Sequence, residues 1–556
     1  MSSANLTILI TIILYMLMTI VIGLYFSNKN KNTGDFYLGG RKLGPFVTAM
    51  SAEASDMSAW LLMGLPGLAY LSGSAEAFWT IIGLGVGTYI NWLIVAKRLR
   101  LYSNRVGAIT IPDFFANRFK DKYALKLIAA IMIIVFFVPY TGSGFAACGS
   151  LFNSLFGVDY HGAMIISAAV IIIYTTLGGF LAASTTDFVQ GIIMTVALVA
   201  VVIFGLWSLG GLDQVLKTAQ EIPGYLGFTH TTTHMGIDKG FVDMAKQAST
   251  HIKDLANSDI FKNLAPQGVG PFGLITIIST LAWGLGYFGM PHVLLRFMAI
   301  ENPKKLKTSR RVASIWVFVS MFIALFIGLM GQAMTKAKMI PFLSTEKSGI
   351  LNLIDDKNPL TNQQNIIVEI AKFMSDHAIL LAIVAGIILA GILASTMSTS
   401  DSQLLAASSS VSENILDGVF KIKLSDAKKM LIARLAVIVI AIIGVVIAWD
   451  PDSSVFDIVQ FAWGGFGATF GPVMLCSLFW KRANKYGCIA GMIVGAITIF
   501  VWKFLVRPNV PALDFYELLP AFILALITII VISLLTPAPD AEIQEEFDSV
   551  KKAMKA

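Results

Sequence analysis

The sequence predicts an all-α membrane protein that crosses the bilayer about 13 times, and two observations carry this prediction. The 556-residue chain is 56% hydrophobic and only 13% charged, whereas soluble domains carry about 25% charged residues. The apolar residues also gather in blocks of roughly 20, which is the length of helix that spans a bilayer. Because backbone groups in lipid must be hydrogen-bonded within the chain, we expect these blocks to be helices.

The apolar blocks follow one another along the chain, with polar junctions between them. The first block has neither a basic leader nor a small-residue cleavage site, so we expect a retained helix rather than a signal peptide. The ten-residue alternation of a β-barrel strand is not found. The approximate spans are 6–26, 46–72, 77–97, 125–153, 161–180, 187–209, 271–297, 311–335, 366–410, 430–449, 454–479, 486–506 and 514–536.

Basic residues predict the orientation of the chain in the membrane. Lys and Arg gather at the junctions after the first, third, seventh and eleventh segments, near 29–42, 97–122, 296–311 and 481–485. Positively charged junctions face the cytoplasm, so we expect the N-terminus outside and the C-terminus inside. The net charge of +7 is explained by these junctions. We see no basic stripe with interleaved aromatic residues and exclude nucleic acid as a partner.

The second segment, 46–72, carries two acidic residues well inside its ends, Glu53 and Asp56. A charge at such depth costs about 2.5–3.5 kcal/mol even on lenient scales, so it usually faces a cavity or an ion path. Serines around Asp56, with Pro66 downstream, favour a helix that unwinds where it lines a cavity. The alternative is a polar seam that hydrogen-bonds neighbouring helices.

The seventh segment, 271–297, is interrupted by three glycines and a proline. Trp283 and Tyr287 stand four residues apart there, on one face of the helix. Aromatic residues of this kind often form an interfacial belt. Because both lie near the middle of the segment, we favour a wall against which a solute packs.

Hydroxyl side chains run through the ninth segment, including Ser395, Ser398 and Thr399. Such a run can hold neighbouring helices together through hydrogen bonds between them. Hydroxyl and carbonyl oxygens are also the ligands that a small, hard cation prefers. Both interpretations stay open on this pattern alone.

The two interrupted segments lie five segments apart. Discontinuous helices at corresponding positions of two halves point to a transporter site. Five helices in each half, inverted between halves, explain this spacing. We therefore expect an N-terminal helix and loop (1–45), a first repeat (46–209), an extracellular loop (210–270), a second repeat (271–480) and two C-terminal helices with a cytoplasmic tail (481–556).

Long motifs in these segments resemble the sodium:solute symporter family, and within it the bacterial members that transport proline. The motifs are GGRKLGPFVT at 39–48, ASDMSAWLLMGLPG at 54–67, WGLGYFGMPH at 283–292, MST and QLL within 397–405, and AWGGFGA at 462–468. The resemblance runs from about residue 10 to residue 535. It implies a leucine-transporter-type core of two inverted five-helix repeats, with one extra N-terminal and two extra C-terminal helices.

The resemblance also implies roles for individual residues. A Na+ site maps onto the backbone carbonyls of Ala54, Met57 and Ser395 and the hydroxyls of Ser398 and Thr399. Positions linked to substrate match Asp56, Ser58, Trp60, Tyr140, Trp283 and Tyr287. Positions linked to ion coupling and release match Arg41 and Asp187, which we expect at cytoplasmic helix ends. Glu53 stands where an enteric member has glycine, and we expect a seam residue or an additional acidic ion ligand.

The implied function is uptake of L-proline coupled to inward Na+ movement, across a bacterial cytoplasmic membrane. We expect lipid around the chain, no organic cofactor and no obligatory protein partner. A symporter of the same family for another small solute and a transport-fold nutrient sensor stay open as alternatives. A membrane enzyme is disfavoured, because we find no nucleophile–base pair, and neither the six histidines nor the three cysteines show metal-ligand spacing.

Overall fold

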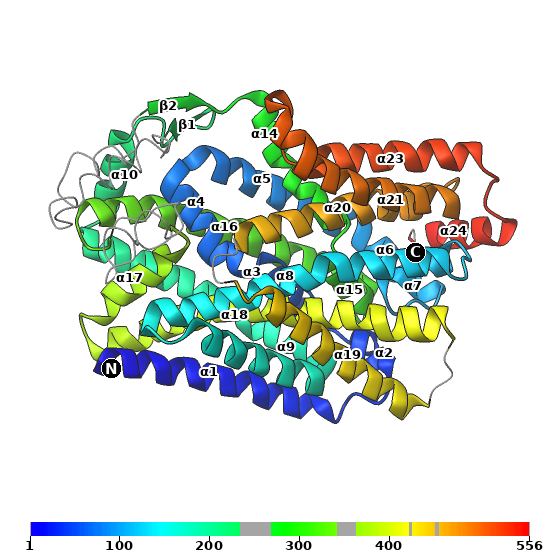
Figure 1. Ribbon diagram of the computed structural model, residues 1–556, viewed down its shortest axis with the longest axis horizontal. Helices are drawn as coiled ribbons and strands as arrows, with labels where there is room; N and C mark the ends of the chain where they lie inside the picture. The colour runs from blue at the N-terminus through cyan, green and yellow to red at the C-terminus, as the bar shows by residue number, and fades with distance from the viewer. Residues whose placement is uncertain (1, 234–267, 342–362, 422–424, 451–454, 555–556) are drawn as a thin grey trace.

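The computed structural model describes residues 2–233, 268–341, 363–421, 425–450 and 455–554. Long helices lie side by side along its longest axis (Figure 1). The all-α membrane fold predicted from the sequence is confirmed. The first half contains α1 (Ser3–Ser27), α2 (Thr33–Leu38), α3 (Pro45–Ala59), α4 (Leu65–Ser72), α5 (Ser74–Ile90), α6 (Ala96–Arg105), α7 (Ile111–Arg118), α8 (Ala124–Phe156), α9 (Tyr160–Leu209) and α10 (Leu212–Glu221).

The second half follows a short hairpin, in which β1 (His230–Thr233) pairs antiparallel with β2 (Gly268–Pro271), with His230 opposite Pro271. The helices after it are α14 (Leu274–Leu281), α15 (Pro291–Ala299), α16 (Leu306–Lys336), α17 (Ile366–Ser375), α18 (Ile379–Ser409), α19 (Asp426–Ile447), α20 (Val455–Phe479), α21 (Lys485–Val501), α22 (Arg507–Asn509), α23 (Leu518–Leu535) and α24 (Ala541–Ala553). The helix α18 packs against α9, α1, α8 and α3, which places it inside the bundle.

Within the described residues, ten helices are long and apolar enough to cross a membrane, or eleven if the bent pair α14–α15 counts as one span. The predicted count of 13 is therefore not confirmed. The predicted segment 46–72 is divided into shorter pieces, and the predicted segments 161–180 and 187–209 both lie in α9, which consists of two helical parts that meet at a kink at Gly179. The predicted segment 366–410 is divided in turn, because α17 ends at Ser375 and α18 begins at Ile379.

Residues 181–186, where the sequence predicted the boundary between two segments, are helical, and the break in α9 lies just before them at Gly179. Thr185 and Thr186 donate hydrogen bonds to the carbonyls of Leu181 and Ala182, four residues earlier. Their hydroxyls are thereby satisfied inside a helix. The chain kinks instead at Gly179, whose φ of 59° is a conformation that glycine adopts readily.

Both interrupted segments of the prediction are broken helices. In the first, α3 is followed by a π-helical turn, η2 (Trp60–Gly64), and then by α4, with Pro66 in its first turn. In the second, α14 leads through a 3-10 turn, η4 (Ala282–Phe288), into α15, with a bend of 45°. Such irregular turns are frequent at functional sites.

The two ends of the bundle differ in what covers them. The N-terminus lies at the end that carries α10 and the β1–β2 hairpin, and α2, α6, α7 and α24 lie at the opposite end (Figure 1). Much of the predicted loop 210–270 falls in 234–267, and residues 342–362 also lie outside the described residues. The division into 1–45, 46–209, 210–270, 271–480 and 481–556 stays a prediction.

The C-terminal helix α24 packs against the end of the bundle that carries α2, α6 and α7 (Figure 1). Its Phe547 side chain lies under the guanidinium groups of Arg98 and Arg118, at 4.8 and 5.3 Å. Lys120 forms an ion pair with Glu546 at 2.6 Å, and Lys481 pairs with Asp548 at 2.7 Å. The predicted tail is therefore an ordered helix that contacts the basic junctions after the third and eleventh predicted segments.

Candidate substrate and ion site

The site begins at the break in α3. All residues from Thr48 to Ala59 are buried, and Ser58 has a φ of 48° and a ψ of −167°. Such a backbone conformation is costly for a residue with a side chain and persists only where the surroundings enforce it. The backbone N–H of Trp60 is shared between the Ser58 hydroxyl oxygen, at 3.2 Å, and the Met57 carbonyl.

The two broken helices meet at an acid and a phenol. The Tyr287 hydroxyl donates a hydrogen bond of 2.6 Å to Asp56 Oδ2. The rings of Trp60 and Trp283 lie 6.0 Å apart. Tyr140, on α8, is also buried. The structure thus brings together Asp56, Ser58, Trp60, Trp283 and Tyr287, five of the six residues predicted to contact substrate. The sixth, Tyr140, lies near Ser58 and Asp56.

Further residues hold this aromatic group in place, and the sequence analysis did not identify them. Trp463 Nε1 donates to the Trp283 carbonyl at 2.8 Å, and the Trp463 ring meets the Tyr287 ring edge-on at 5.1 Å. Asn91 donates to the Tyr287 carbonyl at 3.0 Å. The available signal for Trp463 was its place within the motif at 462–468. Gly286 allows the contact, because a Cβ there would lie 2.0 Å from the Trp463 ring nitrogen.

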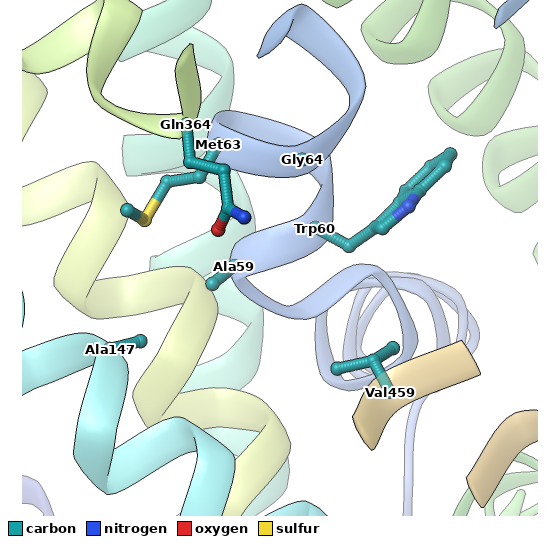
Figure 2. A pocket seen from close by; sticks show the side chains of 7 residues that line it. All are labelled: Ala59, Trp60, Met63, Gly64, Ala147, Gln364 and Val459. Carbon is teal, nitrogen blue, oxygen red and sulfur yellow. The ribbon is translucent and has the colours of Figure 1, made fainter. Parts of the chain in front are cut away.

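A small cavity of about 10 Å³ adjoins the break on the α4 side, close to the minimum that holds one water. Figure 2 shows the Trp60 side chain on the opposite side of the helix from Met63 and Gln364. The indole of Trp60 and that of Trp283 are each less than 10% exposed. This cavity is too small for a solute the size of an amino acid, which could enter it only if these aromatic side chains move.

Oxygen atoms from α3 and α18 converge beside the break. Ser398 Oγ donates to the Ala54 carbonyl at 2.9 Å and to the Ser395 carbonyl at 3.2 Å. Thr399 Oγ1 donates to the same Ser395 carbonyl at 3.1 Å. The fifth predicted ligand is the Met57 carbonyl, which accepts the backbone N–H of Trp60. Four of the five predicted oxygens are therefore linked by hydrogen bonds, in a set that suits a hard cation.

Glu53 faces a different neighbour. Its Oε1 accepts hydrogen bonds from Trp92 Nε1 at 2.7 Å and from Thr88 Oγ1 at 3.1 Å. Its Oε2 is buried and has no hydrogen-bond partner among the described residues. Asp56 Oδ1 is likewise buried and unpartnered within the described part of the chain. The contacts tie α3 to α5 and to the π-helical turn η3 (Asn91–Val95) after it.

We expected Asp187 at a helix end, but the structure places it inside α9, where it is fully buried. Its Oδ2 accepts a hydrogen bond from Ser51 at 2.7 Å and forms an ion pair with Arg296 Nη2 at 3.0 Å. The helix continues through this position because the hydroxyls of Thr185 and Thr186 donate hydrogen bonds to carbonyls of the preceding helical turn. Position 296 belongs to one of the basic junctions predicted from the sequence, whereas Arg296 is buried, with 1% of its surface exposed.

The buried ion pair extends to α18. Arg296 Nη2 also donates to Ser402 Oγ at 2.5 Å, and Ser402 donates to Asp401 Oδ1 at 3.0 Å. The Tyr174 hydroxyl donates to Asp401 Oδ2 at 2.8 Å. One guanidinium thus lies among two buried carboxylates, a cluster that sequence reasoning missed because its members lie far apart in the chain.

Arg41 lies apart from this cluster. Its guanidinium donates to the carbonyls of Met298 and Ala108 at 2.6 and 2.7 Å and to Ser103 Oγ at 3.1 Å. These contacts connect the segment before α3 to the end of α15 and to the α6–α7 turn. Arg41 and Asp187, which shared one predicted role, therefore contact different partners.

Comparisons with known proteins agree with this architecture. The family model described as "Sodium:solute symporter family" matches residues 36–495. A high-affinity proline transporter of Bacillus subtilis is 38% identical over 538 residues, covering 96% of this chain and 99% of the relative. A sodium/proline symporter of Haemophilus influenzae is 40% identical over 551 residues, covering 98% of each chain.

A solved structure of a Na+-coupled sialic acid symporter, in a substrate-bound outward-open state, superimposes with a TM-score of 0.69 at 18% identity. The match covers 96% of this chain and 99% of that chain. It shows the fold, which is of the leucine-transporter type. The chain is a multi-pass membrane transporter rather than an enzyme, and it belongs to the sodium:solute symporter family.

Proposed function

We propose that this protein couples the inward movement of Na+ to the uptake of L-proline by alternating access. The observation that carries the proposal is the hydrogen bond from Ser398 on α18 to the Ala54 carbonyl at the break of α3. A cation bound among these oxygens would link the two helices directly beside the Asp56–Tyr287 contact. The names of the relatives from Bacillus subtilis and Haemophilus influenzae support proline as the solute.

Sodium would bind to the carbonyls of Ala54, Met57 and Ser395 and to the hydroxyls of Ser398 and Thr399. The hydroxyl hydrogens now point to carbonyls, so binding requires both hydroxyls to rotate and present their lone pairs. Bound Na+ would then replace the hydrogen bonds between α3 and α18 with shorter and stronger ionic contacts. This would fix the conformation of the broken helix around Ser58.

Proline would bind next to the fixed break. Unpaired amides at the start of a helical segment favour a carboxylate, and Asp56 Oδ1 would accept a hydrogen bond from the substrate amine. Trp60, Trp283, Tyr287 and Tyr140 would enclose the apolar ring, and Ser58 would set the backbone that meets the carboxylate. Proline is zwitterionic, so each cycle would carry the charge of the Na+.

The coupling roles of Arg41, Glu53 and Asp187 are part of this proposal. Arg41 connects the segment before α3 to α15, and Asp187 on α9 contacts both Ser51 of α3 and Arg296 of α15. Glu53 anchors α3 to η3 and α5. We also propose the orientation predicted by the basic junctions, with the N-terminus outside and the α24 end in the cytoplasm of a bacterium.

The direct test is uptake of labelled proline into proteoliposomes with and without an inward Na+ gradient. A membrane potential of ~100 mV adds about 2.3 kcal/mol for each Na+ that enters, so an inside-negative potential should increase accumulation further. Excess unlabelled proline should block uptake, and glucose, pantothenate and sialic acid should not. Blocking by one of those three without blocking by proline would identify a symporter for another solute. Binding without any uptake would identify a sensor.

A further inference from the structure

A second and larger cavity lies away from the proposed transport site, between α3, α9 and α16. It has a volume of about 380 Å³ and is lined mainly by apolar side chains, among them Met50, Leu198, Trp316 and Val319. Of the α16 residues in its lining, Ile315 is 65% exposed and Val319 is 51% exposed. In a membrane-spanning helix such exposure faces lipid, so the cavity is open to the hydrocarbon of the bilayer.

The face of α16 that lines this cavity changes character along its length. Lys307, Arg311, Ile315 and Val319 follow one another at intervals of four, which places them on one side of the helix. The first two are basic and the last two are apolar. At 1.5 Å per residue, the lining from Arg311 to Ile323 extends roughly 18 Å along the helix axis.

The charge at the mouth of the cavity is uncompensated. Among the described residues, Arg311 and Lys307 have no hydrogen-bond or ion-pair partner, whereas the nearby Lys305 pairs with Glu301 at 2.5 Å. The adjacent Arg310 is directed elsewhere, over the ring of Tyr89 at 5.4 Å. A guanidinium at the polar end of an apolar, lipid-facing cavity is complementary to a molecule with an anionic head and a hydrocarbon tail.

We infer that this cavity binds one anionic phospholipid, with an acyl chain between α3, α9 and α16 and its phosphate at Arg311 and Lys307. The basic junction lies at the end of α16 that the orientation rule assigns to the cytoplasm, where anionic lipids are concentrated. The lining residue Met50 lies four residues before Ala54, so the tail contacts the helix that carries the proposed ion site. The lipid site itself does not depend on which solute is transported.

Trp316 provides a probe inside the cavity. Its Nε1 donates to Thr195 Oγ1 at 2.8 Å, which holds the indole in the lining. The purified chain is reconstituted in phosphatidylcholine vesicles with increasing fractions of brominated phosphatidylglycerol or brominated phosphatidylcholine, because bromine quenches nearby tryptophans. The difference between the protein and Trp316→Phe isolates this indole from the other nine of the ten tryptophans.

We expect half-maximal quenching of Trp316 at a several-fold lower fraction of the anionic lipid than of phosphatidylcholine. Arg311→Gln should reduce this preference by about fivefold, the contribution of one basic side chain near an anionic surface. Lys428→Gln serves as the control, because Lys428 is exposed at the start of α19 and does not line the cavity. It should leave the preference unchanged.

Ser320→Leu adds bulk to the lining and should reduce quenching by either lipid, because it fills the space of the tail. Equal quenching by the two lipids, or an unchanged preference in Arg311→Gln, would overturn the inference. So would competition by soluble glycerol phosphate, since that would make the site one for a free anion. Quenching that is unaffected by Ser320→Leu would show that no acyl chain occupies the cavity.

Discussion

The hydroxyl of Tyr287 donates a hydrogen bond of 2.6 Å to Asp56 Oδ2, and this bond joins the two broken helices of the bundle. Asp56 precedes the positive φ of Ser58 by two residues, and Tyr287 lies in the 3-10 turn between α14 and α15. Because each helix is irregular where the other meets it, a change in one alters the position of the other. Three predictions test this junction and its supports, and two more test the attachment of α24.

Asp56→Asn should leave a folded protein with strongly reduced Na+-driven uptake. Asparagine can still accept the hydrogen bond from Tyr287 through its carbonyl oxygen, so the contact between the helices remains. The negative charge is lost, and hydrogen bonds to charged groups contribute about 1.5–3 kcal/mol, which corresponds to roughly 10- to 100-fold in uptake at low solute. Initial rates in proteoliposomes provide the measurement. Uptake at the normal rate, with unchanged Na+ dependence, would assign Asp56 to packing alone.

Thr399→Val should raise the Na+ concentration needed for half-maximal transport, with a smaller effect at saturating Na+. Valine keeps the shape of threonine and removes one oxygen of the proposed Na+ site. Thr396→Val is the matched control on the same helix, because Thr396 bonds to the Ile392 carbonyl and is not among the proposed ligands. A Na+ titration of uptake compares the two. If both variants shift the curve equally, the ion site is misplaced.

Arg296→Met should destabilise the protein by about 3–5 kcal/mol, because it leaves the carboxylate of Asp187 buried without its partner. The double variant Arg296→Met/Asp187→Asn should recover part of this loss, since neither charge then remains in that pair. Thermal unfolding in detergent measures both variants. A single variant as stable as the parent protein would mean that the ion pair contributes nothing to the inner packing of α3, α9 and α15.

Phe547→Ala should release α24 from the end of the bundle, because it removes the ring beneath Arg98 and Arg118. Hydrogen exchange should rise in 541–553 and stay unchanged in 45–72. Glu545→Ala, an exposed position on the same helix, is the control. Equal exchange in Phe547→Ala and in the control would show that the ring does not hold the helix.

The attachment of α24 should also depend on pH. The hydrogen bond from Lys481 lowers the pKa of Asp548 below its usual value. A carboxyl group whose pKa is lowered in the folded state stabilises that state above its ordinary pKa, and the contribution is lost as the pH falls through the lowered value. Exchange in 541–553 should therefore stay level from neutral pH down to the ordinary pKa of an aspartate and rise as the medium is acidified below it. Exchange that is independent of pH, after correction for the intrinsic rate, would contradict this role.

The sequence predicted the features that depend on local composition. The length of the apolar blocks predicted the helices. Glycine, proline and serine marked both breaks, since these residues weaken a helix wherever they gather. Asp56 and Tyr287 were singled out because a charge or a phenol in mid-membrane is unusual by itself. The structure then placed them in contact, across 231 positions of the chain.

Features that depend on distant partners could not be predicted in this way. Arg296 looked like one more basic residue of a junction until the fold placed it beside Asp187, 109 positions away. The polar residues before Asp187 suggested the end of a helix, but their hydroxyls bond to the carbonyls of the preceding turn. Trp463 stood in a recognisable motif, yet only the packing of α20 against η4 gives it a contact with Tyr287.

The central claim is that Na+ and proline bind to one connected site, and equilibrium binding tests it most directly. Calorimetric titration of the purified protein with proline, at a series of Na+ concentrations with choline as the replacement cation, gives the affinity for proline. Linkage requires that Na+ raise the affinity for proline by the same factor by which proline raises the affinity for Na+. We predict a factor of at least about tenfold, which Thr399→Val shifts to higher Na+ concentrations. An affinity for proline that is the same in Na+ and in choline would contradict the account.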